Sequence, residues 1–248
     1  MDLQFKNKVI IVTDGAKGIG AGIVEVLAEE GALPVIIAPT QEDNESLIAR
    51  LKLKNQEVGA VVAELSDPEQ CKEAVNKVVE QYGRIDGLIN NAGTSDRVRL
   101  ASGSHDDFVK WIHQNLIHYF LVTQAALPEL IKSKGSIVNI GSKTADTGHG
   151  GISAYAVNGG RNAFTREWSV ELLQHGIRVN SVIVMEWPTL IDEEWLKTFP
   201  GPKAAFHNIK SKISIGNRII TPHEIANVVV FLLSERSSHT VGQIITCG

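Results

Sequence analysis

The strongest constraint on the fold of this chain is a regular alternation between short apolar runs of strand length and longer amphipathic segments of helix length. The apolar runs occupy residues 9–12, 34–38, 58–63, 87–90, 136–140, 178–183 and 243–246. The amphipathic segments occupy residues 18–30, 42–54, 68–82, 105–130, 153–175 and 221–234. Strands that are apolar on both faces and separated by helices form parallel sheets covered on both sides. We therefore predict one α/β domain over residues 1–248, with a doubly wound, seven-stranded parallel sheet in three α/β/α layers.

One region, residues 186–218, breaks this alternation. Its aromatic side chains stand among prolines and charged residues, and they are Trp187, Trp195, Phe199 and Phe206. Two compatible interpretations remain open. The region is a helical excursion with its own small core, or it is a lid whose aromatic side chains close over a substrate.

The composition argues against several kinds of partner. A net charge of −4 gives no electrostatic reason to bind nucleic acid or an anionic membrane. No apolar stretch reaches the roughly 18 residues of a membrane span, and the first residues lack the apolar segment of a signal peptide. Cys71 and Cys247 have no zinc-like or redox spacing. We expect a cytoplasmic protein that binds a small molecule, but no metal, nucleic acid or membrane.

A glycine-rich turn at residues 13–20, with the sequence TDGAKGIG, joins the first predicted strand to the first predicted helix. Glycines in such a turn let the backbone approach a pyrophosphate, and the helix amino terminus supplies unpaired N–H groups and a positive dipole. Because a strand precedes the turn and a helix follows it, the turn predicts a Rossmann-like dinucleotide site. The expected coenzyme contacts are Gly15, Lys17, Gly18, Ile19 and Gly20.

This turn resembles the Thr-Gly-x-x-x-Gly-x-Gly turn of the short-chain dehydrogenase/reductase family, and further motifs of that family follow it. Residues 90–93 (NNAG) come after the fourth predicted strand, Asn115 lies in a long helix, and Ser142 precedes Tyr155 by 13 residues. The chain resembles bacterial L-fucose dehydrogenases in particular, at residues 27–32, 115–119, 142–145 and 165–168. The resemblance implies an oxidoreductase that acts on a sugar or a small alcohol or carbonyl compound with NAD or NADP.

The resemblance also implies roles for individual residues. Ser142 would hold the substrate oxygen, Tyr155 would act as the acid–base, and Asn115 would anchor a water relay. Further coenzyme contacts are implied at Glu64, Leu65, Asn91, Ala92, Gly93 and Thr189. The helices near residues 105–130 and 153–175 are expected to pair across a two-fold axis, in a homodimer or homotetramer.

The lysine that the family places four residues after the tyrosine is absent, because residue 159 is glycine. An unperturbed tyrosine has a pKa of about 10, so only about 0.1% of it is ionised at pH 7. Lowering that pKa by about 3 units takes roughly 4 kcal/mol of favourable interaction, for which the expected cation is missing. Turnover is therefore expected to be impaired.

Other residues near Tyr155 bear on the loss of the lysine, either as substitute cations or through packing. Lys143 and His149 remain open as substitutes for the missing lysine. Arg161 lies about 600° around a regular α-helix from Tyr155 and is expected to point away from it. Small residues at 159 and 160 would allow close packing against a neighbouring helix, which would not explain the lost charge.

Two further departures concern the coenzyme. Asp14 replaces the first glycine of the turn, and its carboxylate would repel a pyrophosphate unless Lys17 neutralised it. Val184 and Met185 replace a Pro-Gly pair and would bring side chains toward the nicotinamide. No acid follows the second strand, at residues 38–40, so Lys17 favours NADP over NAD.

These departures leave three functions open. The first is an oxidoreductase with impaired turnover. The second is a catalytically inactive pseudoenzyme that binds a ligand or a protein partner on the same scaffold. The third is a structural subunit of a mixed oligomer.

Overall fold

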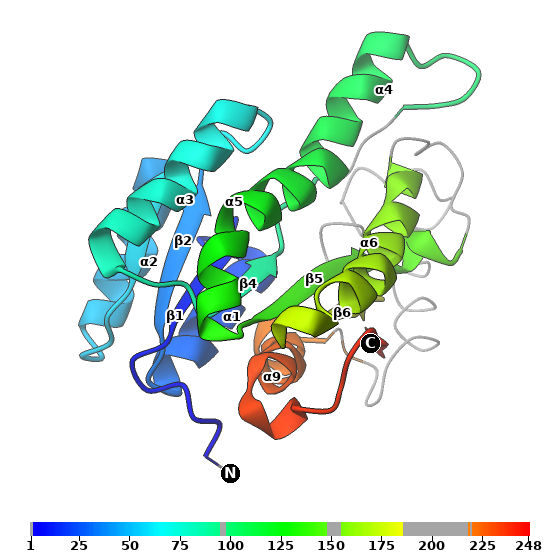
Figure 1. The fold of residues 1–248 in the computed structure, drawn as a ribbon. Coiled ribbons are helices and arrows are strands. Elements are labelled where there is room, and N and C mark those ends of the chain that lie inside the picture. The colour runs from blue at the N-terminus through cyan, green and yellow to red at the C-terminus, as the bar shows by residue number, and fades with distance from the viewer. Residues whose placement is uncertain (1, 95–97, 148–154, 186–217, 219) are drawn as a thin grey trace.

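The computed structural model describes residues 2–94, 98–147, 155–185, 218 and 220–248. Seven strands form one parallel sheet in the order β3-β2-β1-β4-β5-β6-β7, which confirms the predicted doubly wound fold (Figure 1). The strands are β1 (Val9–Thr13), β2 (Leu33–Ala38), β3 (Gly59–Val62), β4 (Gly87–Asn90), β5 (Ser136–Ser142), β6 (Arg178–Val184) and β7 (Ile244–Cys247). Apart from Arg218, the predicted excursion at 186–218 lies outside the described residues.

Helices cover both faces of the sheet, as the apolar strands require (Figure 1). They are α1 (Gly18–Glu29), α2 (Gln41–Lys52), α3 (Pro68–Tyr82), α4 (His105–Ile112), α5 (His118–Ser133), α6 (Asn158–Glu171) and α9 (Pro222–Leu233). One core lies beneath α1, α2 and α9, and includes Ile23, Leu51 and Val230. The second core lies beneath α3, α5 and α6, and includes Val78 and Tyr119. The predicted three layers are confirmed.

Side-chain caps begin two of the predicted helices. Asp67 accepts hydrogen bonds from the first-turn N–H groups of α3 at Glu69 and Gln70. Thr221 and Glu224 form a reciprocal capping box at the start of α9. Each cap satisfies N–H groups that the helix itself leaves unpaired. The sequence therefore located these two helix starts correctly.

The long helix predicted over residues 105–130 is interrupted. A π-helical segment, His113–Ile117, separates α4 from α5. Short π-helical segments inside α-helices are rare and occur frequently at functional sites. This one holds Asn115, whose side chain is fully buried. The helix predicted over residues 153–175 also differs, because a short 3₁₀ turn at Tyr155–Val157 precedes α6.

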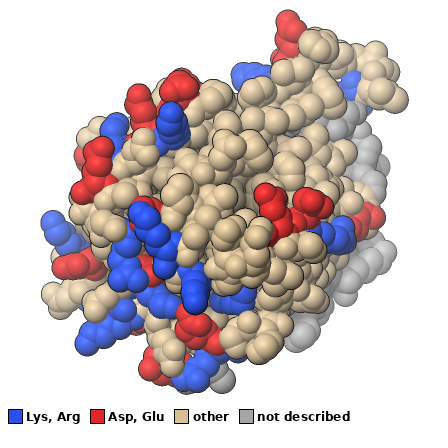
Figure 2. All heavy atoms as spheres, viewed as in Figure 1, with Lys and Arg blue, Asp and Glu red and all other residues tan. Residues whose placement is uncertain are grey.

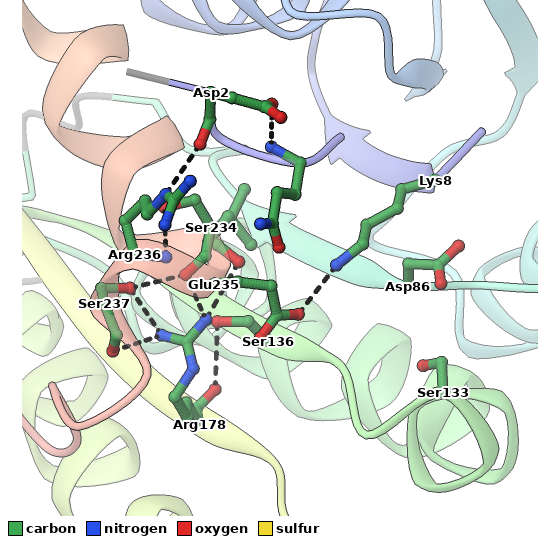
Figure 3. Close-up of polar contacts among 12 residues, drawn as sticks. Asp2, Lys8, Asp86, Ser133, Ser136, Arg178, Ser234, Glu235, Arg236 and Ser237 are labelled. Carbon is green, nitrogen blue, oxygen red and sulfur yellow. Dashed lines mark hydrogen bonds and ion pairs between the residues drawn. The ribbon is translucent and has the colours of Figure 1, made fainter. Parts of the chain in front are cut away.

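A partly buried arginine secures the end of the sheet opposite the glycine turn. Arg178, the first residue of β6, donates hydrogen bonds to the carbonyl oxygens of Leu232, Leu233 and Ser234 (Figure 3). Those carbonyls end α9, where a cation also interacts favourably with the helix dipole. Arg178 therefore holds α9 against the sheet and has a structural role.

Charged side chains of both signs are interleaved over much of the visible face, and uncharged side chains cover its centre (Figure 2). In α5, residues 118–128 contain no Asp, Glu, Lys or Arg. Among the described helices, none is both long and apolar enough to cross a membrane.

Candidate functional site

The carboxyl ends of β1 and β4 meet where the strand order reverses, and ligands of open α/β sheets bind at such a point. The Asn91 amide donates to the carbonyl oxygens of Thr13 (3.0 Å) and Asp14 (3.2 Å). The Thr13 hydroxyl accepts from the backbone N–H groups of Asn91 (2.8 Å) and Ala92 (3.0 Å). The structure therefore joins the glycine turn to the 90–93 motif, two regions that the sequence predicted for one site.

The amino terminus of α1 suits a phosphate group. Among the described residues, no side chain caps this helix, and its first turn contains no acidic residue. Gly20 must be glycine for the turn to close, because a Cβ there would collide with the carbonyl oxygen of Asp14. The N–H groups of this turn can thus bind an anion, which is the fit that a dinucleotide requires.

Asp14 opposes that anion. Its backbone φ of 51° lies in the left-handed region that glycine adopts most easily. Burial raises the pKa of its carboxyl group, and the nearby charge of Lys17 lowers it only in part. Lys17 does not act on Asp14 alone, because its ammonium forms an ion pair with Asp43 on α2 at 2.7 Å. Two carboxylates thus share one ammonium beside the turn.

The same ion pair weakens the sequence argument for NADP. An ammonium held by Asp43 is less available to a 2′-phosphate, and Asp43 itself repels one. Glu64 and Leu65, two other expected coenzyme contacts, follow β3. The Glu64 carboxylate accepts from the N–H and hydroxyl of Ser66, whereas the Leu65 side chain is buried in the core.

Of the three expected catalytic residues, the structure describes the side chains of Ser142 and Asn115. Ser142 ends β5, and its hydroxyl oxygen accepts from the N–H of Thr144 at 3.4 Å. The Asn115 side chain accepts from the N–H of Thr94 (3.0 Å) and donates to the carbonyl of Trp111 (3.1 Å). The side chain of Tyr155, like Thr189 and His149, lies outside the described residues.

Arg161 is the site residue that sequence reasoning missed. Its side chain is 3% exposed, and its Nε donates to the backbone carbonyl of Asn115 at 2.7 Å. It also donates to the carbonyls of Ile140 (3.1 Å) and Ala92 (3.5 Å), and to the Asn115 side-chain oxygen (3.3 Å). We expected Arg161 to point away from Tyr155, and this expectation stays a prediction because the Tyr155 side chain lies outside the described residues. Arg161 is hydrogen-bonded directly to Asn115. An arginine between small residues of a core helix was the available signal.

The glycine pair at 159 and 160 has two different explanations. A Cβ at Gly160 would lie 3.0 Å from a Leu116 methyl carbon, so this glycine permits close packing of α6 on the π-helical segment. Among the residues that the structure describes, a Cβ at Gly159 would meet only the carbonyl oxygen of Ala145, at 3.9 Å. Packing between described residues therefore explains Gly160 but leaves Gly159 unexplained.

Lys143, the candidate substitute cation, lies in the 3₁₀ turn that follows Ser142. Its side chain is partly buried, and this burial lowers the pKa of its ammonium group.

Val184 and Met185 were expected to face the nicotinamide. Instead, Val184 is 5% exposed and belongs to the core beneath α1 and α9, so packing accounts for it. Met185 lies against Gly248 and donates its N–H to the carbonyl of Cys247.

Within the described ranges, no group of three or more His, Cys, Asp or Glu side chains could hold a metal ion. Cys71 and Cys247 are both buried free thiols. Burial raises the pKa of the Cys71 thiol to about 11, which makes it unreactive near neutrality.

Known proteins resemble this chain along nearly its whole length. The family model described as Enoyl-(Acyl carrier protein) reductase matches residues 15–247. The 3-oxoacyl-[acyl-carrier-protein] reductase FabG of Thermotoga maritima is 35% identical over 245 residues, 98% of this chain and 97% of that protein. The L-fucose dehydrogenase of Bos taurus is 31% identical over 253 residues, 100% of this chain and 91% of that protein.

A solved structure agrees with these matches. The L-sorbose reductase of Gluconobacter frateurii, complexed with NADPH and L-sorbose, gives a TM-score of 0.91 at 25% identity. The match covers 100% of this chain and 97% of that one. Sequence, fold and the geometry of the glycine turn agree, and the chain belongs to the short-chain dehydrogenase/reductase family of oxidoreductases.

Proposed function

We propose that the protein transfers a hydride between a nicotinamide dinucleotide and a sugar or another small alcohol or carbonyl compound, with slow turnover. One observation carries the proposal: Asn91, just after β4, donates to the carbonyls of Thr13 and Asp14, where the glycine turn begins, and this turn leads to the uncapped amino terminus of α1. This arrangement supports a pyrophosphate site at the turn. A relative that is an L-fucose dehydrogenase and a solved L-sorbose reductase support a sugar as substrate.

The coenzyme that we propose is NAD rather than NADP, which reverses the preference expected from Lys17 alone. Asp43 holds the Lys17 ammonium, and Asp14 adds a second carboxylate. A 2′-phosphate would bring two further negative charges into this region. The nicotinamide, when bound, supplies or accepts the hydride.

The chain's own residues would manage the proton and the substrate oxygen. Ser142 would donate a hydrogen bond to that oxygen, and Tyr155 would exchange the proton with it. Asn115 is held rigidly in the π-helical segment, so it can fix neighbouring groups. Since Gly159 offers no ammonium, a smaller fraction of Tyr155 is ionised at neutral pH than in a member with the lysine, and turnover is slow.

The test is reduction of NAD or NADP by purified protein with L-fucose, L-sorbose and simple secondary alcohols, followed by the absorbance of the reduced nicotinamide. We expect a slow rate with NAD that Tyr155→Phe abolishes. Equal rates for both proteins, or no rate with any substrate while an intact relative is active, would contradict the proposal.

A second candidate function is a non-catalytic member that binds a ligand or partner, and Gly159 with Asp14 favours it. Thermal unfolding with NAD, NADH, NADP and NADPH separates the two candidates. A coenzyme at 100 times its Kd adds about 2.7 kcal/mol to the free energy of unfolding. A clear rise in Tm would favour the enzyme, and no rise would favour the non-catalytic member.

We also propose that two or four copies associate through α5 and α6. Large apolar side chains are exposed there, with Phe120 on α5 at 44% and Val170 on α6 at 70%, and Leu173 in the 3₁₀ turn after α6 is 56% exposed. Phe120→Glu should lower the mass measured by light scattering to that of a monomer, whereas Leu53→Glu, the same change at an even more exposed apolar residue outside these helices, should not. A monomeric parent protein would refute the association, and a complex with a different chain would favour the structural-subunit hypothesis.

A further inference from the structure

We propose that Arg161 is a positioning residue: a buried guanidinium that holds Asn115 and the ends of β4 and β5 in place and supplies a positive charge that Gly159 lacks. The inference rests on the proposed function, since it assigns Arg161 to the site of that reaction. Arg161 lies on α6, six residues after Tyr155.

The hydrogen bonds of Arg161 reach three parts of the site at once. Nε and Nη2 both contact Asn115, at its backbone carbonyl (2.7 Å) and its side-chain oxygen (3.3 Å). Nη1 binds the carbonyl of Ile140, two residues before Ser142 on β5, at 3.1 Å. Nη2 also reaches the carbonyl of Ala92, in the 90–93 motif. A planar fork with several donors suits such an arrangement, whereas a lysine would provide a single point of attachment.

Neighbouring residues are shaped around the guanidinium. The ring of Tyr119 lies beneath it, with 4.4 Å between the guanidinium carbon and the ring centre. The Tyr119 hydroxyl donates to the same Ile140 carbonyl, at 2.8 Å. A Cβ on Gly93 would lie 2.7 Å from Nη2, so the site has space for the arginine only because residue 93 is glycine.

Within the described residues, no acid neutralises the charge of Arg161. Its hydrogen-bond partners within the described part of the chain are carbonyl and amide oxygens, and none is a carboxylate. The titratable groups that face it are His118 and Tyr119 on α5. Burial first, and then the charge of Arg161, lower the pKa of His118 to about 4, so this ring is neutral at pH 7. The guanidinium is therefore a net positive charge beneath the site.

A positive charge at this position would favour ionisation of Tyr155. The two residues are separated by roughly 10 Å along the helix axis, from the rise of a 3₁₀ turn followed by an α-helix. For charges about 10 Å apart and an effective dielectric constant of about 20, a unit charge lowers the pKa of an acid by about one unit. This recovers about a third of the shift that a good base would need, in agreement with slow rather than absent turnover.

The test titrates the tyrosines directly and needs neither coenzyme nor substrate. The chain has three tyrosines, so labelling their ring Cζ atoms with carbon-13 gives three resonances, which Tyr→Phe variants assign. We expect the pKa of Tyr155 to lie about one unit below the ordinary value of about 10 in the unmodified protein, and to rise by about one unit in Arg161→Met. Arg161→Lys should retain most of the lowering.

Arg178→Met is the control, since it also removes a guanidinium, here a partly buried one, that binds backbone carbonyls. It should lower Tm and leave the pKa of Tyr155 unchanged. A Tyr155 pKa at or above the ordinary value in the unmodified protein would overturn the inference, even if Arg161→Met failed to fold. So would the same pKa in folded Arg161→Met. If the pKa is lowered but no substrate is oxidised, the proposed function fails and the assignment of Arg161 stands.

Discussion

Acid should destabilise this protein through one histidine, His118, which is 1% exposed beneath the site. Its two ring nitrogens face the carbonyl oxygens of His113 (3.2 Å) and Ala92 (3.1 Å). Burial and the charge of Arg161 lower its pKa from 6.5 to about 4. Between these two pH values the His118 imidazole is protonated in the unfolded chain and neutral in the folded protein. The free energy of unfolding therefore falls as the pH falls.

The size of this loss follows from the two pKa values. Each pKa unit corresponds to about 1.4 kcal/mol, so a lowering of about two and a half units costs about 3 kcal/mol by pH 4. This is a large part of the roughly 5–15 kcal/mol by which such proteins are stable. The loss should begin near pH 6.5 and be complete near pH 4.

Urea unfolding at several pH values, on the parent protein and on His118→Gln, measures this loss. The difference between the two proteins cancels the other histidines and the carboxylates, which both proteins share. The parent should lose about 3 kcal/mol more than the variant between pH 7 and pH 4. Parallel curves for the two proteins would show that His118 is not the buried neutral ring described above.

Three further predictions concern the same site. Asp14→Asn should raise Tm at neutral pH, where burial disfavours the carboxylate, and this gain should shrink as the pH falls and Asp14 becomes protonated; an unchanged difference across pH would count against the burial. Gly159→Lys should increase the rate of coenzyme reduction by at least about tenfold, since it restores an ammonium four residues after Tyr155 and no described residue crowds a Cβ at 159; no increase would mean that the proton step is not limiting. Gly93→Ala should lower the free energy of unfolding by about 1–3 kcal/mol in urea, because its Cβ would press on Arg161; a neutral effect would show that the guanidinium moves easily.

Much of the fold follows from local patterns. Apolar runs gave all seven strands in order, and Asp67 and Thr221 marked helix starts because each satisfies N–H groups close by in sequence. The π-helical segment could not be read this way, because its extra residue per turn leaves a similar spacing of apolar residues. Tertiary packing, which places Asn115 against Arg161, determines it.

The candidate site was predictable as a set of segments but not as a set of contacts. The turn at 13–20 and the motif at 90–93 were assigned to one site, and hydrogen bonds from Asn91 join them. The partner of Lys17 was not predictable, since Asp43 belongs to the next helix and competes with a residue only three positions away. The importance of Arg161 was missed because a helical wheel gives only the direction of a side chain around its own helix. It does not show which carbonyl groups of other segments that side chain reaches.

The most direct measurement is calorimetric titration of NAD and NADP into the parent protein and into the double variant Asp14→Gly, Gly159→Lys. We expect saturable binding of NAD to the parent, weaker binding of NADP, and at least about tenfold tighter binding of NAD to the variant, since a tenfold change requires only about 1.4 kcal/mol. The pyrophosphate site would be contradicted if neither protein bound either coenzyme. Identical affinities in both proteins would show that Asp14 and Gly159 are not what weakens the site.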